Sequence, residues 1–270
     1  METFEATFLG TNGSCAYNNG KRKKYGSNTT CIAVKTGDEL IVFDSGSGIY
    51  GLSDVTGGSK PPINLFFSHY HADHIEGLLF CRELFDPHEK IVIYGSKYKD
   101  LDIRGILENY LSPPFSPAGF KDFKAQIDFK TVKGEDAVEL PNGARVSIFS
   151  VSHPGSALGY RVDYCGKSFC SCCDIELGLH KDGDGLLDFI KGADLLVLDS
   201  FFDDGMVTPG WGHSSWMESA TWAKKAGAKQ LALLHFSPRI TDEDIDVIQE
   251  KARAVFPYAF TAADHMKISL

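Results

Sequence analysis

The feature that most constrains this chain is a run of three histidines and one aspartate within six residues. The run, His69-Tyr70-His71-Ala72-Asp73-His74, lies just past the apolar stretch 63–67, which has the composition of a buried strand. Imidazole nitrogen and carboxylate oxygen are ligands that Zn²⁺, Mn²⁺ and Fe²⁺ accept in proteins. A turn at the end of a strand can direct such side chains toward one point or toward two neighbouring points. Because the chain of 270 residues has only nine histidines, chance does not account for this run, which predicts a metal site.

The composition is that of an ordinary globular protein, with 43% hydrophobic and 23% charged residues. The length suffices for a substantial core, and without a linker or low-complexity segment we expect one domain over residues 1–270. No run of 18 or more apolar residues occurs, so we expect no membrane-spanning segment. Residues 1–7 lack a basic segment followed by an apolar run, so we expect no signal peptide and a cytoplasmic location.

Seven cysteines are an odd number, and reduced thiols agree with a cytoplasmic protein. Four of them crowd together at Cys165, Cys170, Cys172 and Cys173. Their spacing lacks a paired CxxC, which disfavours a zinc site. In a strand, Cys170 and Cys172 would share one face and Cys173 would take the other. We therefore interpret all four as small, buried apolar side chains.

The charged side chains give a net charge of −9, from 27 basic and 36 acidic residues. Proteins that bind nucleic acids usually need a basic face that displaces counterions from phosphates. The charge therefore disfavours a nucleic-acid partner and favours a small-molecule substrate. One basic run, Lys21-Arg22-Lys23-Lys24, stands out from this acidic background. The oligomeric state stays open, with a homodimer as one option.

Short strand-like runs alternate with helical patterns along the whole chain, which predicts an α/β protein. We expect strands near residues 7–9, 30–34, 40–43, 65–67, 91–94, 146–149, 160–162, 195–198 and 231–234. Helical patterns cover 75–85, 98–111, 214–226 and 241–254, the last with a capping-box-like start at Thr241 and Asp244. A β-rich stretch that ends in helices occurs twice. Two sheets packed face to face, with helices outside, would satisfy this order.

A site for two metals needs roughly seven protein ligands, so the six-residue run cannot supply all of them. Strand ends hold ligands in place while loops leave room for a substrate, so we expect further His or Asp ligands at later strand ends. Three residues fit this description: His153 after the strand near 146–149, Asp174 after the run 169–173, and His235 after the strand 231–234.

With these residues the chain resembles the metallo-β-lactamase-fold hydrolases nearly from end to end. The resemblance rests on the run 69–74, the strand and turn at 42–46, the Ser152-His153-Pro154 turn, Asp174 and His235. It implies a four-layer αββα sandwich and two divalent metal ions, zinc in the first place, with manganese and iron as alternatives. It also implies the ligands, which are His69, His71 and His153 for one ion, Asp73, His74 and His235 for the other, and Asp174 as a bridge.

Such a centre predicts hydrolysis. Two metals about 3.5–4 Å apart can share a hydroxide, because coordination lowers the pKa of water toward neutrality. Asp73 would ligate one metal and could also orient that hydroxide through a hydrogen bond, which makes it a candidate catalytic residue. The metals would further neutralise a phosphoryl or carbonyl oxygen in the transition state.

Fold alone does not select a substrate within this superfamily, but the C-terminal third resembles ribonuclease Z and its small-substrate phosphodiesterase relatives. The resemblance rests on Gly212-His213-Ser214-Ser215 before a helix and on His235-Phe236-Ser237-Pro238. His213 could protonate an alkoxide leaving group, oriented by Asp199 or Asp203. In the alternative interpretation, His213 only starts the helix and Ser214 is the N-cap.

The N-terminal loop resembles the same subgroup in residues 9–14 and in Tyr25-Gly26-Ser27-Asn28-Thr29-Thr30. Backbone N–H groups of such a loop can cradle a phosphate, and the basic run 21–24 lies within it. A structural turn explains the glycines equally well. The resemblance makes Asn28 and Ser237 candidate substrate-binding residues. His265 lies where relatives tend to have glycine, and its role stays open.

Two departures from the ribonuclease Z pattern disfavour tRNA processing. Only 21 positions separate His153 from Asp174, too few for the extended tRNA-gripping arm of ribonuclease Z, and the chain is acidic. We therefore expect a dinuclear phosphodiesterase that acts on a small phosphodiester or a cyclic nucleotide. The alternatives are a hydrolase of carboxylic esters, thioesters or lactones, a ribonuclease Z-like nuclease, and a metal-dependent binding protein without turnover.

Overall fold

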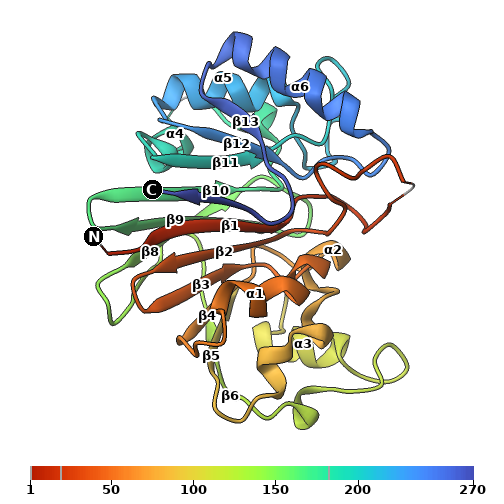
Figure 1. Cartoon of the computed structure of the whole chain (residues 1–270), viewed down its shortest axis with the longest axis vertical. Helices are drawn as coiled ribbons and strands as arrows, with labels where there is room; N and C mark the ends of the chain where they lie inside the picture. The colour runs from red at the N-terminus through yellow and green to blue at the C-terminus, as the bar shows by residue number, and fades with distance from the viewer. Residues whose placement is uncertain (1, 19, 182) are drawn as a thin grey trace.

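The computed structural model describes residues 2–18, 20–181 and 183–270. Within these residues the chain forms two seven-stranded sheets that pack face to face, with helices on the outer face of each sheet (Figure 1). This arrangement confirms the predicted αββα sandwich. The two chain ends lie at one end of the sheets, while helix α2 (Ala72–Ile75), which carries part of the histidine run, lies at the other end (Figure 1).

The first sheet combines the N-terminal half of the chain with the last strand, in the order β14-β1-β2-β3-β4-β5-β6. Its strands are β1 (Phe4–Gly10), β2 (Cys31–Thr36), β3 (Glu39–Phe43), β4 (Ile63–Phe66), β5 (Lys90–Gly95), β6 (Gln126–Thr131) and β14 (Met266–Ser269). Strands β3 to β6 run parallel, so the residues that follow β3 and β4 emerge at the same edge of the sheet.

The second sheet has the order β13-β12-β11-β10-β9-β8-β7. Its strands are β7 (Ala137–Glu139), β8 (Arg145–Val151), β9 (Ala157–Tyr164), β10 (Lys167–Cys172), β11 (Leu195–Asp199), β12 (Leu231–Leu234) and β13 (Ala259–Thr261). Strands β10 to β13 run parallel, whereas β9 and β10 form an antiparallel hairpin with a two-residue turn at Cys165 and Gly166. The residues after β10, β11 and β12 therefore also emerge together.

Helices close the outer faces of both sheets. The α-helices besides α2 are α1 (Leu52–Thr56), α3 (Ile103–Tyr110), α4 (Leu186–Ile190), α5 (Trp216–Ala226) and α6 (Asp242–Val255). The 3-10 turns are η1 (Ser47–Gly51), η2 (Leu78–Phe80), η3 (Arg82–Phe85), η4 (Phe120–Asp122) and η5 (Leu177–Leu179). Among the described residues, none of these helices has both the length and the apolar character that crossing a membrane requires.

Some of the predicted helices match the observed helices and others do not. The capping box at Thr241 and Asp244 is confirmed at the start of α6. The predicted helix 75–85 is wrong, because α2 ends at Ile75 and two 3-10 turns follow. The reason is a close contact at Gly77, where an added Cβ would lie 2.1 Å from the carbonyl oxygen of Gly46, so the chain bends there to pack against the preceding turn. The helix predicted from residue 98 begins at Ile103, because Asp102 accepts a hydrogen bond from Gly105 as its N-cap.

Three apolar clusters bind the four layers together. The inner cluster lies between the sheets, where the Phe43 ring stacks on Tyr160 and Phe169 with centroids 5.2 and 5.7 Å apart. One outer cluster lies beneath α1 to α3, and the other lies beneath α4 to α6. Each large side chain that is removed from water in this way stabilises the fold by roughly 1.5–3 kcal/mol.

The cysteine cluster divides between these layers. Cys170 and Cys172 are buried in the outer cluster under α4 to α6, and Cys173 is buried in the inner one, as the strand alternation predicts. The prediction that Cys165 is buried is wrong. Cys165 is exposed because it forms the tight β9–β10 turn, with a left-handed φ of 49°.

Candidate metal centre

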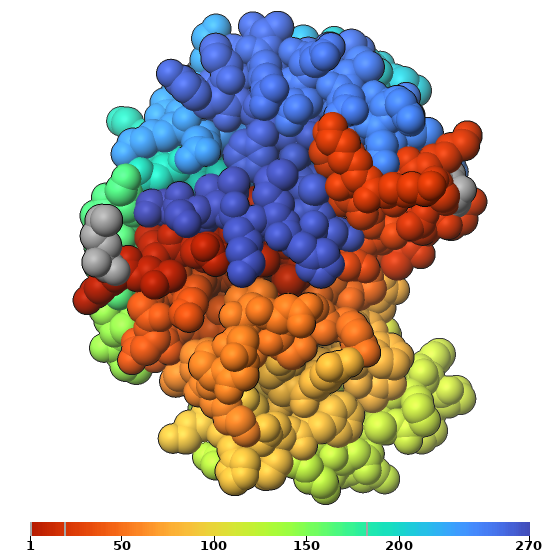
Figure 2. Space-filling view, in the orientation of Figure 1, coloured from red at the N-terminus to blue at the C-terminus, as the bar shows by residue number. Residues whose placement is uncertain are grey.

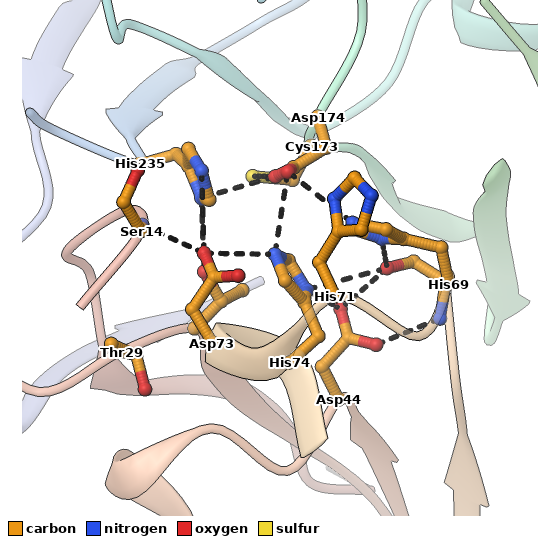
Figure 3. A network of polar contacts seen from close by, with 12 residues as sticks. Ser14, Thr29, Asp44, His69, His71, Asp73, His74, Cys173, Asp174 and His235 are labelled. Carbon is orange, nitrogen blue, oxygen red and sulfur yellow. Dashed lines mark hydrogen bonds and ion pairs between the residues drawn. The ribbon is translucent and has the colours of Figure 1, made fainter. Parts of the chain in front are cut away.

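The seven side chains that the sequence predicts as ligands converge at one end of the two sheets. Figure 3 labels all of them except His153. One group of donors comprises His69, His71, His153 and Asp174, and another comprises Asp73, His74 and His235. Within each group the donor atoms all lie within 4.8 Å of one another. Asp174 lies between the two groups. Its Oδ2 is 3.6 Å from Nε2 of His69 in the first group and 3.4 Å from Nε2 of His74 in the second. These are two adjacent donor sets with a carboxylate between them, and Asp174 and His235 also form a further group with Asp199 and His213.

Strand ends supply these donors. The run 69–74 follows β4, His153 follows β8, Asp174 follows β10 and His235 follows β12. Asp174 and His235 have left-handed φ values of 56° and 62°, and Asp44 after β3 has 61°. Such a conformation is uncommon for residues other than glycine. It turns the chain sharply at the strand end, so that the side chain points across the sheet edge into the centre.

Asp44 fixes the orientation of two of the histidines. Its Oδ2 accepts hydrogen bonds from Oγ of Ser68 at 2.8 Å and from Nδ1 of His74 at 2.9 Å. Because the Ser68 hydroxyl donates its proton to Asp44, its oxygen accepts from Nδ1 of His69, 3.0 Å away. Nδ1 of each imidazole therefore donates a proton, and Nε2 of each is directed toward the centre. Metal-binding histidines in proteins are held in the same manner.

These two Nε2 atoms are the strongest sign that the site suits cations. Nε2 of His69 and Nε2 of His74 are buried and have no hydrogen-bond partner among the described residues. A buried polar atom without a partner is costly, and native proteins rarely contain one. A divalent ion at each position would satisfy both atoms, so the residues present fit a dinuclear centre.

His153 is oriented from the other side. Its Nδ1 lies 2.7 Å from the carbonyl oxygen of Gly212, which can only accept, so Nδ1 donates. Its Nε2 lone pair then faces Nδ1 of His71 at 3.1 Å and Oδ2 of Asp174 at 3.7 Å. The two imidazole nitrogens can share a proton, and a cation between them and the carboxylate would bind all three atoms.

The protonation preferences agree with metal binding. Burial lowers the pKa of four histidines, which favours the neutral form that ligates metals: His69, His71, His153 and His235. His74 differs, because the carboxylates of Asp174, Asp44 and Asp73 outweigh its burial and raise its pKa well above the usual range. Three carboxylates thus hold one proton where a divalent ion would supply the positive charge.

The N-terminal loop closes the centre next to Asp73. The backbone N–H of Ser14 donates to Oδ2 of Asp73 at 2.7 Å (Figure 3). Gly13 lies against the imidazole of His235, where an added Cβ would come within 2.6 Å of Nε2. Figure 2 shows this loop projecting on the same side of the molecule as the segment near residues 112–119, with the surface indented between them.

His213 lies beside the donors, paired with Asp199. Its Nδ1 is 2.8 Å from Oδ2 of Asp199, and its ring stacks on Phe201 with centroids 4.5 Å apart. Burial opposes the charged form, but the charge and hydrogen bond of Asp199 raise the pKa of His213 to about 9. Asp203, the other predicted orienting residue, instead accepts a hydrogen bond from Trp216. Ser214 is not the helix N-cap either, because Ser215 forms the capping box of α5.

The candidate substrate-binding residues make hydrogen bonds within the protein. Nδ2 of Asn28 donates to the carbonyl oxygen of Leu9 at 3.1 Å, which is a structural contact. The hydroxyl of Ser237 accepts from the N–H of Arg239 at 3.4 Å. Neither residue belongs to a donor group or lines the cavity beside the centre, so the substrate role of Asn28 and Ser237 stays a prediction.

Two backbone N–H groups of the basic run are not available to a phosphate. The N–H groups of Lys23 and Lys24 donate to Oδ2 of Asp242, at 2.7 and 2.8 Å, and so are already occupied. The guanidinium of Arg22 is buried over the ring of Phe236. This loop is therefore fastened to the start of α6. His265 lies exposed in the turn before β14, with a left-handed φ of 66°.

A small cavity adjoins His69 and His71. It has a volume of about 230 Å³ and is otherwise lined by Tyr70, Tyr98, Ile106, Pro154 and Gly155. This volume lies below the roughly 300–1,000 Å³ of pockets that hold drug-sized ligands. The cavity can therefore hold one substituent of a substrate rather than a whole large molecule.

Several residues at the centre were not predicted. Ser14 and Gly212 act through backbone groups, which leave no trace in side-chain chemistry. Ser68 directly precedes the histidine run, and its position beside a first ligand is a signal that could have identified it. Glu176, two residues after Asp174, is buried and accepts hydrogen bonds from the loop that precedes His213.

Comparison with known proteins gives consistent matches. The family described as the beta-lactamase superfamily domain matches residues 41–236. Ribonuclease Z of Methanosarcina acetivorans is 25% identical over 316 aligned positions, which cover 98% of this chain and 97% of that protein. Because the alignment is longer than this chain, that relative contains segments without a counterpart here.

Two solved structures show the same fold over essentially the whole chain. The metallo-beta-lactamase fold protein YhfI from Bacillus subtilis has a TM-score of 0.75 and 20% identity, and the match covers 100% of both chains. A diphosphatase from the PhnP family has a TM-score of 0.72 and 21% identity, with 99% of this chain and 98% of that chain covered.

Proposed function

The chain belongs to the beta-lactamase superfamily and is a metal-dependent hydrolase, and we propose that it cleaves a small phosphodiester or a cyclic nucleotide. The observation that carries the choice of substrate is the pair of His213 and Asp199 beside the metal donors. A phosphodiester releases an alkoxide, which needs a proton, and an imidazole held by a carboxylate can supply one. Attack on the carbonyl of an ester or lactone has less need of such a donor.

We propose that two divalent ions bind, with zinc as the first candidate and manganese and iron as alternatives. His69, His71 and His153 would hold one ion, and Asp73, His74 and His235 the other. Asp174 would contact both. When bound, such ions lower the pKa of water and neutralise charge on a phosphoryl group. The support comes from the two buried, unpartnered Nε2 atoms and from the two adjacent donor sets.

The other steps belong to side chains of this protein. Asp73 has one carboxylate oxygen engaged by the N–H of Ser14, which fixes the plane in which the carboxylate can orient an attacking water. His213 would deliver a proton to the leaving oxygen from its Nε2, because Nδ1 faces Asp199. Phe201 stacks on the imidazole and limits its rotation. The attack and the protonation thus come from residues on different loops.

The size of the site supports a small substrate. The cavity of about 230 Å³ beside His69 and His71 accommodates one substituent of the phosphate. The short turn at Cys165 and Gly166 leaves no arm between β9 and β10 for a long nucleic acid. The net charge of −9 further disfavours a polyanion.

A substrate screen tests this proposal. The purified protein, stripped of metal and reconstituted with zinc, manganese or iron, would be assayed against bis(p-nitrophenyl) phosphate, cyclic nucleotides, lactones and thioesters. We expect hydrolysis of the phosphodiesters that disappears on chelation and in Asp174→Ala. Faster hydrolysis of a lactone or thioester than of any diester would favour the carbonyl-hydrolase alternative. If Asp174→Ala retained both ions and full activity, the proposal that Asp174 is a ligand of both ions would be contradicted.

A ribonuclease Z-like nuclease is the second candidate. The similarity to ribonuclease Z of Methanosarcina acetivorans, over nearly the full length of both chains, favours it. Cleavage of a precursor tRNA is therefore the competing outcome.

A further inference from the structure

Glu176 connects three loops of the centre, although it contacts none of the metal donors through its carboxylate. Its side chain is only 4% exposed. Oε2 accepts hydrogen bonds from the N–H of Gly210 at 2.9 Å and of Gly212 at 3.0 Å, and Oε1 lies 3.1 Å from the same Gly210 nitrogen. Its own N–H donates to the carbonyl oxygen of Ser152, directly before His153.

We propose that Glu176 is a positioning residue that orients both the metal-binding imidazole of His153 and the proton-donating imidazole of His213. The proposal rests on the proposed function for His213, but not for His153. The carboxylate acts through the backbone of residues 210–212. Hydrogen bonds to an ionised carboxylate are stronger than those between neutral groups, so one side chain can hold this exposed loop.

The path to His153 runs through Gly212. The Gly212 N–H donates to Glu176, and the Gly212 carbonyl oxygen accepts from Nδ1 of His153 at 2.7 Å. An added Cβ at Gly212 would lie 2.3 Å from the same Nδ1, and its φ is +80°. Only glycine can therefore bring the carbonyl this close. The contact assigns the His153 proton to Nδ1 and leaves Nε2 free for the ion.

Glu176 acts on His213 through the peptide that joins Gly212 to it. His213 follows Gly212 directly, so fixing Gly212 also fixes where the His213 side chain begins. On the other side, the hydroxyl of Ser214 donates to the carbonyl oxygen of Ile175 at 2.5 Å and accepts from the N–H of Leu177 at 2.9 Å. The segment 175–177 therefore holds the His213 loop on both sides of the imidazole.

Two of the large apolar side chains of the loop before this point face solvent. Met206 and Trp211 are exposed, at 67% and 60%, and so contribute little apolar anchoring. Without the carboxylate, the buried N–H of Gly212 would have no acceptor. We expect the loop to shift, and His153 and His213 to shift with it.

The first test needs no catalysis. We would compare Glu176→Ala, Glu176→Gln and the matched control Glu39→Gln. Glu39 is equally buried, with 4% of its surface exposed, and it accepts a hydrogen bond from Asn64. It is the first residue of β3, at the end of the strand away from the centre. In the metal-free protein, nitrogen NMR of His153 should report a single Nδ1-protonated form in the wild type and in Glu39→Gln. We expect a mixture of both tautomers in Glu176→Ala.

Zinc titration against a chromophoric chelator extends this test. Removal of a residue that supports metal ligands typically costs 10–100-fold in affinity, and we expect a loss of that size in Glu176→Ala for the ion held by His153. Glu176→Gln keeps one acceptor oxygen and should lose less. A wild-type tautomer and wild-type zinc affinity in a folded Glu176→Ala would overturn the link to His153. If Glu176→Ala does not fold, a wild-type tautomer and affinity in Glu176→Gln would overturn it.

The second test uses turnover. For an alkyl phosphodiester, we expect kcat of Glu176→Gln to fall about tenfold with KM nearly constant, and the loss to be smaller for a p-nitrophenyl diester. Equal losses on both, with unchanged zinc affinity, would show that Glu176 only stabilises the fold and would overturn the proposal. If the wild type hydrolyses no diester, the proposed function fails, while the tautomer and zinc measurements still decide the role of Glu176 toward His153.

Discussion

At the scale of single residues, the imidazole of His213 separates phosphodiester hydrolysis from carbonyl chemistry. If it protonates the leaving oxygen, His213→Ala should lower turnover of an alkyl phosphodiester by about 10²–10⁴-fold. The loss on bis(p-nitrophenyl) phosphate should be much smaller, because p-nitrophenolate leaves without a proton. Steady-state kinetics on the two substrates, with metal content measured in parallel, provide the comparison.

The exposed His265 supplies the control for this substitution. His265→Ala removes an imidazole from a turn outside the centre and should change neither substrate's turnover. Equal losses on both diesters in His213→Ala would indicate that His213 positions the substrate instead. Unchanged rates on both would leave it a purely structural residue and reopen the ester, thioester and lactone alternatives.

Asp44 gives a second prediction at this scale. Because it orients His74 directly and His69 through Ser68, Asp44→Asn should weaken binding of both ions, by about 10–100-fold in zinc affinity. The measurement is competition with a chelator of known affinity. The control is Asp194→Asn, a carboxylate buried to a similar degree that accepts from Ser168 and Lys229. Retention of full zinc affinity in Asp44→Asn would refute the orienting role.

At the scale of elements, one carboxylate fastens the N-terminal loop to helix α6. Asp242 accepts from the N–H groups of Lys23 and Lys24, and Tyr25 also donates to it. Burial opposes its ionisation, but these three N–H groups lower the pKa of Asp242 below its ordinary 3.8. A lowered pKa in the folded state means that the ionised carboxylate stabilises the fold above about pH 4. That contribution is lost as the pH falls further, through the folded-state pKa.

Asp242→Asn should therefore lower the free energy of unfolding by about 1 kcal/mol at pH 7. The difference from the wild type should shrink below pH 4, where the wild-type side chain is also uncharged. Denaturant unfolding at a series of pH values would measure it. The control is Glu243→Gln, which removes a negative charge from the same helix turn but breaks none of the hydrogen bonds between Asp242 and the loop. It should lower the free energy of unfolding by less. If the difference in the free energy of unfolding between Asp242→Asn and the wild type stayed constant from pH 7 to pH 3, the ionised carboxylate would not be its cause.

The elements also show what the sequence could and could not predict. Every predicted strand is present, because strands buried on both faces produce clear apolar runs. Of the strands absent from the predicted list, β6, β7, β13 and β14 are the four edges of the two sheets, and β10, which was expected only as the run 169–173, lies inside the second sheet. Edge strands have fewer neighbours and more polar sequences, such as Gln126–Thr131, so their signal is weak.

The centre follows a similar rule. The histidine run, His153, Asp174 and His235 were predictable because imidazoles and carboxylates at strand ends have distinctive chemistry. The contacts that orient them were not, since every residue has a backbone carbonyl and every residue except proline has an N–H, so Ser14 and Gly212 do not stand out in the sequence. Only the tertiary fold decides which backbone group lies next to a ligand.

At the scale of the whole molecule, shape and charge bear on the question of RNA. The β9–β10 hairpin closes with two residues, and the chain carries a net charge of −9. A protein that makes 6–10 phosphate contacts loses about 10³–10⁵ in affinity between 50 and 200 mM salt, because each contact releases counterions. An acidic chain without an arm is expected to make fewer such contacts. We therefore expect weak binding of precursor tRNA with a shallow dependence on salt.

The corresponding rate measurement compares kcat/KM for a precursor tRNA with 3′ trailer and for the best small diester, at physiological salt and with the same metal. We expect the diester to be preferred. Ribonuclease Z of Methanosarcina acetivorans serves as the positive control, because it is similar over nearly its whole length but contains segments that this chain lacks. If this protein removed the trailer faster than it cleaved any small diester, the metal centre would have to recruit RNA without an arm. The second candidate function would then replace the first, and the loops around the cavity, rather than net charge, would have to explain the specificity.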